Sequence, residues 1–345
     1  MGKIAIVSVM MCILIVLAPM LTAEKEDMGT AESAVEEGYT VIPGEKDEVQ
    51  AENASTVDSQ ITIPVLTGGE VRYLKLDEYL EGVLAAEMPA SFPDEALKAQ
   101  AVAARTFIIH KRSLVEAGEM IDSSHKGAIM CDDPAHCSAY TDIAVNASSV
   151  FGDNADAYTE KIRSAVRDTD GIIMTYGGEP ITSSFHAISG GRTENAADVW
   201  GCDVPYLRSV ESSEDETAAM YESDVAYSTD ELRALLTSQL PDSDLSGETE
   251  TWFKDSVRSE AGGIITVELG GVEVKGTWLR SVLSLASTDF TVEHEDGKVV
   301  FHCIGYGHGV GMSQYGAKQK AEHGAGYEEI LKHYYTGVTT EKLSR

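Results

Sequence analysis

The spacing of apolar residues predicts a helix that ends just before residue 90. Leu80, Val83, Leu84 and Glu87 lie three or four positions apart, so they share one face of this helix, and Met88-Pro89 ends it. A carboxyl group on an apolar face is desolvated, which raises its pKa and suits it to donate a proton near neutral pH. Glu87 is therefore a candidate general acid. The alternative is a glutamate at the rim or cap of the helix with no catalytic role.

The remaining pattern predicts strands and helices without the regular βαβ alternation of parallel sheets, which places the chain in the α+β class. A helix over residues 93–116 is expected to follow the Glu87 helix, and residues 117–160 are expected to be rich in loops. The other expected elements are a hairpin of 61–66 and 71–76 with Gly68-Gly69 as its turn, strands at 171–176, 181–185, 263–269 and 272–274, a helix near 230–240 with a capping box of Ser228 and Glu231, and two final helices around 324–326.

The helix over residues 93–116 is expected to be buried because its middle, Ala99 to Ala104, consists almost entirely of small residues. Arg105 is then a buried cation that needs an anionic or polar partner. A short turn joins this helix to the Glu87 helix, so we expect Arg105 near Glu87. Its charge would favour the carboxylate and oppose desolvation, which predicts a nearly ordinary Glu87 pKa until a ligand displaces water.

The N-terminal pattern differs from the rest of the chain. An uncharged apolar run from Ile4 to Ala23 is long enough to cross a bilayer, and we favour an uncleaved anchor at residues 1–23 over a cleavable signal peptide. Lys3 would stay inside, so the remainder would be exported. Residues 24–60 are acidic and poor in apolar side chains, which predicts a disordered linker. The folded domain is then expected at residues 61–345, with a looser region at about 210–290.

The formal net charge of −31 over 345 residues argues against a nucleic-acid partner, whose phosphates would be repelled. A chain of this length allows one large or two ordinary domains with real cores. Disulfides are permitted in an exported protein, but a domain of this size does not need them.

A cluster of thiols and imidazoles lies between residues 125 and 137. His125, Cys131, His136 and Cys137 offer two thiolates and two imidazoles, the ligand types that favour zinc over magnesium or calcium. Four protein ligands would close the coordination shell, which predicts a structural zinc site. The alternative is a disulfide between Cys131 and Cys137 with two surface histidines.

The stretch Ser184–Thr193 combines His186 and Ser189 with the pair Gly190-Gly191. It lacks the G-x-S-x-G pattern and has no acid obviously placed to orient the histidine, so a serine nucleophile is disfavoured. The favoured interpretation is a loop whose glycines let the backbone approach a ligand. A plain turn is the alternative.

The stretch Gly305–Ala317 is punctuated by glycines and leads into a helix. Its spacing matches neither the Walker nor the Rossmann pattern, which disfavours a phosphate-binding loop. Glycines beside His308, Ser313 and Gln314 make a dense hydrogen-bonding surface that would suit a sugar. A glycine-rich turn between a strand and a helix is the alternative.

Taken together, these stretches resemble the stage II sporulation protein D family, which includes the sporulation D/amidase-enhancer domain. The resemblance covers roughly residues 61–340. The matching segments are Ala85–Pro89, Glu95–Ala101, Ala103–Thr106, Ser189–Glu194, Val199–Gly201, Pro205–Leu207 and Gly307–Ala317. Two features depart from the family pattern: Phe107 stands where many relatives have tyrosine, and the cysteine–histidine cluster is not general to the family.

The resemblance implies a peptidoglycan lytic transglycosylase that acts in engulfment during sporulation, on glycan strands stripped of stem peptides. The glutamate of the A-E-M-P motif, Glu87 here, would protonate the leaving oxygen and then accept a proton from the C6 hydroxyl of the sugar. The product would carry a 1,6-anhydro-muramic acid end, and no second carboxylate would be needed. Arg105 or Arg192 could pair with the lactyl carboxylate of muramic acid.

We therefore expect two lobes around a substrate groove, with Glu87 in the groove. A partner amidase and a membrane scaffold are the expected protein partners, and the engulfing mother-cell membrane is the expected location. The expected substrate-binding residues are Arg105, His186, Ser189, Arg192, His308, Met312, Ser313, Gln314 and Tyr315.

Two other functions remain open from the sequence. One is a glycan-binding module that activates a partner amidase without cleaving glycan itself, which the name of the family's enhancer members suggests. The other is a zinc hydrolase, which would require an open coordination position at the metal.

Overall fold

The computed structural model describes residues 56–345, apart from 119–122, 135, 296 and 344–345. The predicted membrane anchor and most of the predicted acidic linker lie outside these residues. None of the helices in the described part of the chain is both long and apolar enough to traverse a bilayer. The described fold mixes small sheets with helices, in agreement with the predicted α+β class.

The fold begins with the predicted hairpin. Strands β1 (Thr62–Thr67) and β2 (Glu70–Lys75) pair in antiparallel register around Gly68 and Gly69, both at positive φ. The short strand β3 (Met130–Cys131) adds to β1 in parallel and gives the order β2-β1-β3.

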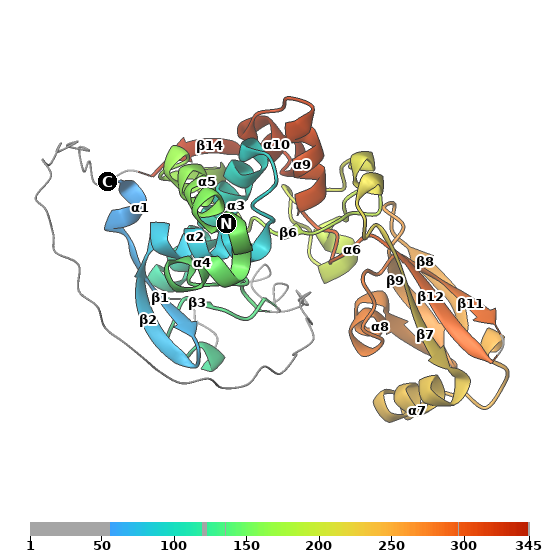
Figure 1. Ribbon diagram of the computed structural model, residues 1–345. Helices are drawn as coiled ribbons and strands as arrows, with labels where there is room; N and C mark the ends of the chain where they lie inside the picture. Colours follow the sequence, from blue (N-terminus) through green and yellow to red (C-terminus); the bar gives the residue numbers. More distant parts are fainter. Residues whose placement is uncertain (1–55, 119–122, 135, 296, 344–345) are drawn as a thin grey trace, which may run out of the picture.

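Helices α2 (Leu76–Glu87) and α3 (Asp94–Glu116) follow, close to their predicted bounds. Helix α3 is central, because it packs against α2, α5, α9, α10 and β4 (Figure 1). Ala99, Ala101 and Ala103 are fully buried on it, and their small side chains let neighbouring elements approach closely. This set of elements surrounds the larger hydrophobic cluster, called here the main core.

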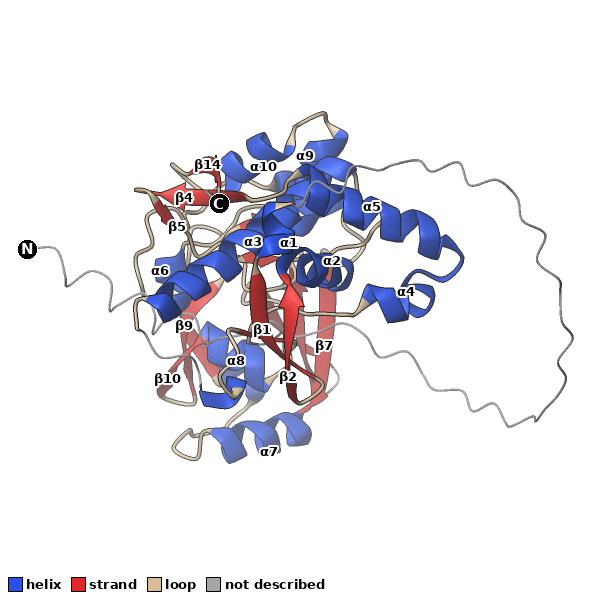
Figure 2. Ribbon diagram, turned by 90° about the vertical axis from the view of Figure 1, so that its left-hand side faces the viewer, coloured by secondary structure: helices blue, strands red, loops and turns tan. Residues whose placement is uncertain are grey.

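The main core is completed by elements from both ends of the described chain (Figure 2). Sheet β14-β4-β5 covers part of it, and β13 pairs in parallel with β6. The elements are α1 (Val57–Gln60), α4 (Ile143–Phe151), α5 (Ala155–Asp168), β4 (Ile172–Tyr176), β5 (Glu179–Pro180), β6 (Phe185–His186), α6 (Ala196–Trp200), β13 (Met312–Ser313), α9 (Gln314–Glu322), α10 (Tyr327–Tyr334) and β14 (Thr339–Lys342), with 3₁₀ turns at Ser123–His125, Gly152–Asn154 and Ser213–Thr217.

A second hydrophobic cluster forms inside what we call the β-rich region, residues 222–304, which lies beside the main core in Figure 1. Two three-stranded antiparallel sheets, β10-β9-β8 and β11-β12-β7, bury Trp252, Phe290 and Phe301. The elements are β7 (Glu222–Ser228), α7 (Thr229–Gln239), β8 (Phe253–Arg258), β9 (Ile264–Leu269), β10 (Val272–Lys275), α8 (Gly276–Val282), β11 (Phe290–Glu295) and β12 (Lys298–Ile304), with a 3₁₀ turn at Thr249–Thr251. The predicted capping box of Ser228 and Glu231 is present on α7.

The prediction that residues 117–160 are rich in loops is confirmed for the described residues up to 142, which hold only a 3₁₀ turn and the short strand β3. It was wrong from residue 143 on, where α4 and the first part of α5 lie, and α5 buries Ile162, Ala165 and Val166 against α3. One predicted strand was also wrong. The strand expected at 181–185 is reduced to its last residue, which joins β6. Hydrogen bonds that involve side chains replace strand pairing in this segment. Thr182 N–H donates to the hydroxyl of Tyr206, and Ser183 Oγ donates to the carbonyl of Ala103 on α3.

The boundary of the predicted linker was also wrong at its C-terminal end. Thr56 caps helix α1, so residues 56–60 belong to the fold. Asp58 is buried and its Oδ2 lies 2.7 Å from Nη2 of Arg105, which is completely buried. A buried guanidinium needs a charged partner, and Asp58 is that partner for Arg105. Asp58 lies in the acidic segment that the sequence predicted to be a linker.

Candidate functional site

Glu87 is the last residue of α2, where Met88 turns the chain into an extended conformation. The backbone N–H of Ala139 donates to Oε1 of Glu87 over 2.6 Å, and the side chain of Gln314 also hydrogen-bonds to the carboxyl group. Burial raises the pKa of Glu87 to about 7, although both hydrogen bonds act to lower it. The expectation of a nearly ordinary pKa in the free protein was wrong, because Arg105 does not act on this carboxyl group.

Gln314 brings the glycine-rich stretch to Glu87. It is the first residue of α9, directly after the short strand β13. That strand pairs in parallel with β6, with Met312 opposite Phe185 and Ser313 opposite His186. The stretch around residues 305–317 therefore reaches the carboxyl group of Glu87 through Gln314, and the stretch around residues 184–193 lies beside it through the pairing of β6 with β13.

His186 and His308 are buried beside each other, with ring centroids 5.7 Å apart. Burial lowers the pKa of His186 to about 4 and that of His308 well below its ordinary value, so both rings are neutral. Nδ1 of His308 accepts from Val310 N–H, and the ring also bonds to the backbone of Phe185. This differs from the predicted sugar contact of His308, since its ring nitrogens are used inside the protein.

Ser189 and Ser313 support the site from within the fold. Both are buried, and both hydrogen-bond to Asp215, a fully buried acid whose pKa is raised by burial. Ser313 Oγ also accepts from Gly316 N–H and so caps α9, the helix that begins with Gln314. The two serines therefore position the Gln314 end of α9, whereas the sequence predicted that they bind sugar.

Sequence reasoning missed two groups of this site. Asp215 lies in an acidic, polar segment where no pattern distinguishes one acid from its neighbours. The N–H of Ala139 carries no side-chain signal at all, so only the fold reveals its contact with Glu87.

The two arginines expected to bind a carboxylate already have protein partners. Arg105 Nε donates to Asp58, and its Nη atoms donate to Thr169 and to backbone carbonyls. Being completely buried, it lies out of reach of a substrate, which corrects the sequence prediction. Arg192 is partly exposed, with Nη2 2.9 Å from Oε1 of Glu260 in the β-rich region.

Of the remaining predicted residues, Met312 is fully buried in the main core. Tyr315 is partly exposed, and its ring packs edge-on against Phe92 with centroids 5.1 Å apart. Tyr315 is next to Gln314 and so carries aromatic surface near the Glu87 carboxyl group.

Comparison with known proteins supports the same region. Residues 67–176, which include Glu87, match the family model described as Stage II sporulation protein. Stage II sporulation protein D of Bacillus amyloliquefaciens is 34% identical over 95% of this chain and 92% of its own length. The chain belongs to the stage II sporulation protein D family. The Bacillus subtilis protein of the same name is also 34% identical, over 98% of this chain and 95% of its own length.

A second relative of this family member carries a different name. The amidase enhancer of Bacillus subtilis is 29% identical over 75% of the chain, which corresponds to 40% of that relative's length.

In this stage II sporulation protein D family member, the cysteine–histidine cluster forms a group that could bind a metal ion. The candidate ligand atoms of His125, Cys131, His136 and Cys137 lie within 4.8 Å of one another, and the two cysteines are not bonded to each other. Sulfur–nitrogen distances are 3.5 to 3.6 Å, close to the roughly 3.3–3.8 Å between ligands of a tetrahedral zinc ion. The two imidazole nitrogens are closer, at 2.7 Å.

Groups around the cluster are arranged for metal binding. Nδ1 of His125 lies 3.2 Å from the carbonyl of Ala128, which suits donation from Nδ1 and leaves Nε2 as the ligand atom. Lys111 Nζ lies 2.9 Å from Sγ of Cys137. Hydrogen bonding to Cys131, His125 and Lys111 holds the pKa of the Cys137 thiol below its ordinary value, which favours a thiolate at Cys137. The same hydrogen bond to Cys137 raises the pKa of Cys131, so the two sulfurs share one negative charge.

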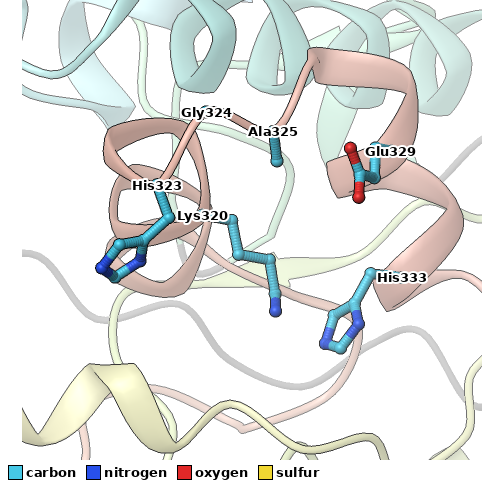
Figure 3. Close-up of a pocket in the computed structure, with 6 residues that line it drawn as sticks. All are labelled: Lys320, His323, Gly324, Ala325, Glu329 and His333. Atoms are coloured by element: carbon cyan, nitrogen blue, oxygen red, sulfur yellow. The ribbon is translucent and has the colours of Figure 1, made fainter.

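A separate hollow of about 450 Å³ opens between α9 and α10 (Figure 3). Lys320, His323 and His333 extend into it from the two helices, with Glu329 at one side. None of the residues predicted to bind substrate lines this hollow.

Proposed function

We propose that this protein is a lytic transglycosylase that cleaves peptidoglycan glycan strands lacking stem peptides. The observation that supports this most directly is the Glu87 carboxyl group, whose pKa is raised to about 7 at the end of α2. A carboxylic acid with this pKa is largely protonated at neutral pH or slightly below, and it can donate a proton to a leaving oxygen.

The proposed reaction uses Glu87 twice. Its protonated carboxyl group gives a proton to the glycosidic oxygen as the bond to the anomeric carbon breaks. The resulting carboxylate takes the proton from the C6 hydroxyl of the same muramic acid, and that oxygen forms the new bond to the anomeric carbon. The products are a 1,6-anhydro-muramic acid end and a free hydroxyl on the leaving sugar, and Glu87 is protonated again.

The surroundings of Glu87 support this reaction over ordinary hydrolysis. Glycoside hydrolases pair two carboxyl groups within about 5–9.5 Å of each other. Among the described residues, no second carboxylate contributes to the Glu87 pKa; the groups that act on it are Ala139 N–H and Gln314. Both can donate to the carboxylate formed in the first step and so stabilise it.

We further propose that the glycan lies in a groove between the main core and the β-rich region, which would form the two lobes of the domain. The support is that Arg192, on the segment between β6 and β7, pairs with Glu260 of the β-rich region, while His186 and Gln314 lie at the adjoining ends of β6 and α9. Tyr315 and Gln314 would contact sugar directly. His186, Ser189, His308, Met312 and Ser313 would shape the groove from beneath.

The cysteine–histidine cluster is proposed to hold a structural zinc ion. Its four residues fit a closed tetrahedral shell, with three of them buried. When bound, zinc would cross-link the two ends of the segment from His125 to Cys137. Four protein ligands leave no open position for a substrate, which disfavours the zinc hydrolase.

We propose that residues 1–23 anchor the protein in the engulfing mother-cell membrane with the folded part outside. The apolar run Ile4–Ala23 supports this proposal. A partner amidase is proposed to supply the substrate, because a strand lacks stem peptides only after the amide to muramic acid has been hydrolysed. A membrane scaffold is the other proposed partner.

A second candidate function follows from one comparison. The relative named amidase enhancer favours a glycan-binding protein that activates an amidase and does not cleave glycan. Digestion of purified glycan strands without stem peptides, followed by mass spectrometry, separates the two functions. The transglycosylase produces 1,6-anhydro ends, whereas an enhancer alone produces none.

A further inference from the structure

Arg280 on α8 is a buried cation without a buried acid beside it. Its side chain is 6% exposed, and its Nε donates to the carbonyl of Ala286 over 3.2 Å. Burial lowers the pKa of the Arg280 guanidinium, and among the described residues no carboxylate pairs with it or acts on it to oppose this. An uncompensated buried cation is costly, so it calls for an anion that arrives from elsewhere.

Arg280 lies against the glycine-rich stretch. The carbonyl of Ala286 that accepts from Arg280 also accepts from Gly307 N–H, at 2.9 Å. Gly307 has a φ of +119°, and a Cβ at this position would lie 2.8 Å from the Cβ of His186. Arg280, Gly307 and His186 are therefore close together, linked by the carbonyl of Ala286 and by the packing of Gly307 on His186.

His186 adds a second polar group without a partner. Its Nδ1 lies 3.2 Å from the carbonyl of Val310, so Nδ1 carries the proton and donates. Its Nε2 is then a buried acceptor, and it has no hydrogen-bond partner in the described structure. The ring of Trp200 lies tilted against the neighbouring His308, with centroids 5.4 Å apart, and adds partly exposed aromatic surface to this junction.

The junction is connected to the proposed catalytic group through the backbone. His186 pairs in register with Ser313, which directly precedes Gln314, and Gln314 contacts Glu87. These contacts link the Arg280–His186 junction to Glu87 through two neighbouring segments, and a glycan held at Glu87 would have to extend over this junction to reach Arg280. The other two arginines considered for this role are already paired, Arg105 with Asp58 and Arg192 with Glu260.

We propose that Arg280 binds the free lactyl carboxylate of muramic acid and thereby selects glycan strands that lack stem peptides. This inference rests on the proposed function, because it names the group that distinguishes the proposed substrate from intact peptidoglycan. In an intact strand the lactyl group is an amide, which is neutral. Only the free carboxylate can form charge-assisted hydrogen bonds to the guanidinium.

His186 stays beneath the groove, and its Nε2 is a second buried polar atom without a partner in the described structure, close to Arg280. The formal net charge of −31 works against binding a strand that carries one carboxylate per muramic acid, and a cation at the binding surface would oppose this repulsion.

The test measures binding in the Glu87→Gln background, so that the glycan stays intact. Two ligands are compared by calorimetry: a glycan oligosaccharide with free lactyl carboxylates, and the same oligosaccharide with these carboxylates converted to primary amides. Arg280→Gln and Arg280→Lys are measured beside Lys254→Gln, which removes an exposed charge from β8 in the same region. Circular dichroism and melting curves show that each variant is folded.

The expected result is that the Glu87→Gln protein prefers the free acid over the amide by about tenfold or more. Arg280→Gln should abolish this preference without weakening binding of the amide, Arg280→Lys should retain part of it, and Lys254→Gln should retain all of it. An equal affinity of the Glu87→Gln protein for the two ligands overturns the inference, and so does an undiminished preference in Arg280→Gln. If Arg280→Gln does not fold, the test rests on Arg280→Lys. An undiminished preference of Arg280→Lys for the free acid would then overturn recognition of the carboxylate by the two-pronged guanidinium.

The failure of this inference is distinguishable from failure of the proposed function. The affinity ratio does not depend on cleavage, and the assay for 1,6-anhydro ends does not depend on the ratio. A protein that cleaves strands while Arg280→Gln keeps the preference for the acid retains the transglycosylase function and loses only the role of Arg280.

Discussion

The N–H of Ala139 donates to Oε1 of Glu87 over 2.6 Å, and Ala139 follows Cys137 by only two residues. The candidate metal cluster and the candidate catalytic acid are thus joined by one short piece of backbone. Burial raises the pKa of Tyr79 on α2, and Cys137, Cys131 and Glu87 raise it further. The cluster is therefore well placed to hold the donor that the carboxylate needs.

Replacing Glu87 with glutamine keeps the size of the side chain and removes the exchangeable proton. We expect a folded protein that still binds glycan, with formation of 1,6-anhydro ends reduced by about 10²–10⁴-fold. Glu81→Gln is the matched control on the same helix, since Glu81 pairs with Arg163 at the surface and should matter little. Wild-type turnover by Glu87→Gln would remove Glu87 from the mechanism.

The raised pKa of Glu87 predicts a pH dependence of both activity and stability. Cleavage should decline as the pH rises above about 7, because the acid form is lost.

The same raised pKa predicts a pH-dependent stability of the fold. Since the folded pKa of Glu87 lies above the ordinary 4.5, the contribution of its protonated form to the free energy of unfolding is fully present below about pH 4.5 and is lost as the pH rises through 7. The free energy of unfolding should fall by up to about 3 kcal/mol more over this range in the wild type than in Glu87→Gln. Identical urea-denaturation profiles against pH in the two proteins would contradict this.

Removing a ligand of the cluster should mainly affect stability. Cys131→Ser or Cys137→Ser is expected to release zinc and lower the free energy of unfolding by roughly 3 kcal/mol or more, with a smaller effect on the chemistry. The control is Cys303→Ser, which alters a buried cysteine of the β-rich region outside the cluster. This variant should contain as much zinc as the wild-type protein. Elemental analysis of the purified wild-type protein provides the measurement, and an absence of metal there would favour the disulfide.

Gln314→Ala should change the Glu87 pKa without disrupting the fold. The hydrogen bond from Gln314 lowers that pKa, so its loss should move the alkaline limb of the pH–activity profile to higher pH. Gln319→Ala, on the same helix with an exposed hydrogen bond to Thr217, is the control and should leave the profile in place. A limb that does not move in Gln314→Ala would show that the contact is unimportant in solution.

Asp58→Ala should destabilise the whole fold, although Asp58 precedes the first strand. The change leaves the Arg105 guanidinium buried without its carboxylate, at a cost of about 3–5 kcal/mol. Asp153→Ala, which removes an exposed acid, should cost less than about 0.5 kcal/mol. Equal midpoints of urea denaturation for the two variants would argue against the buried pair.

The sequence by itself determined the elements that have a local signature. Gly68-Gly69 marks the β1–β2 turn, the 3.6-residue period marks α2, and the capping box marks α7, because each depends on residues close together in the chain. The same local pattern placed Glu87 on an apolar face and identified His125, Cys131, His136 and Cys137 as a group. The family motifs added the order of these segments.

Tertiary structure alone decided which distant groups act on one another. Asp58 pairs with Arg105, Gln314 and the Ala139 N–H reach Glu87, and Arg280 lies beside His186 without an acid. No local pattern encodes these contacts, because they depend on how helices and strands pack around two separate cores. The pKa of Glu87 follows the same rule: it is set by the water that packing excludes and by the donors that packing supplies.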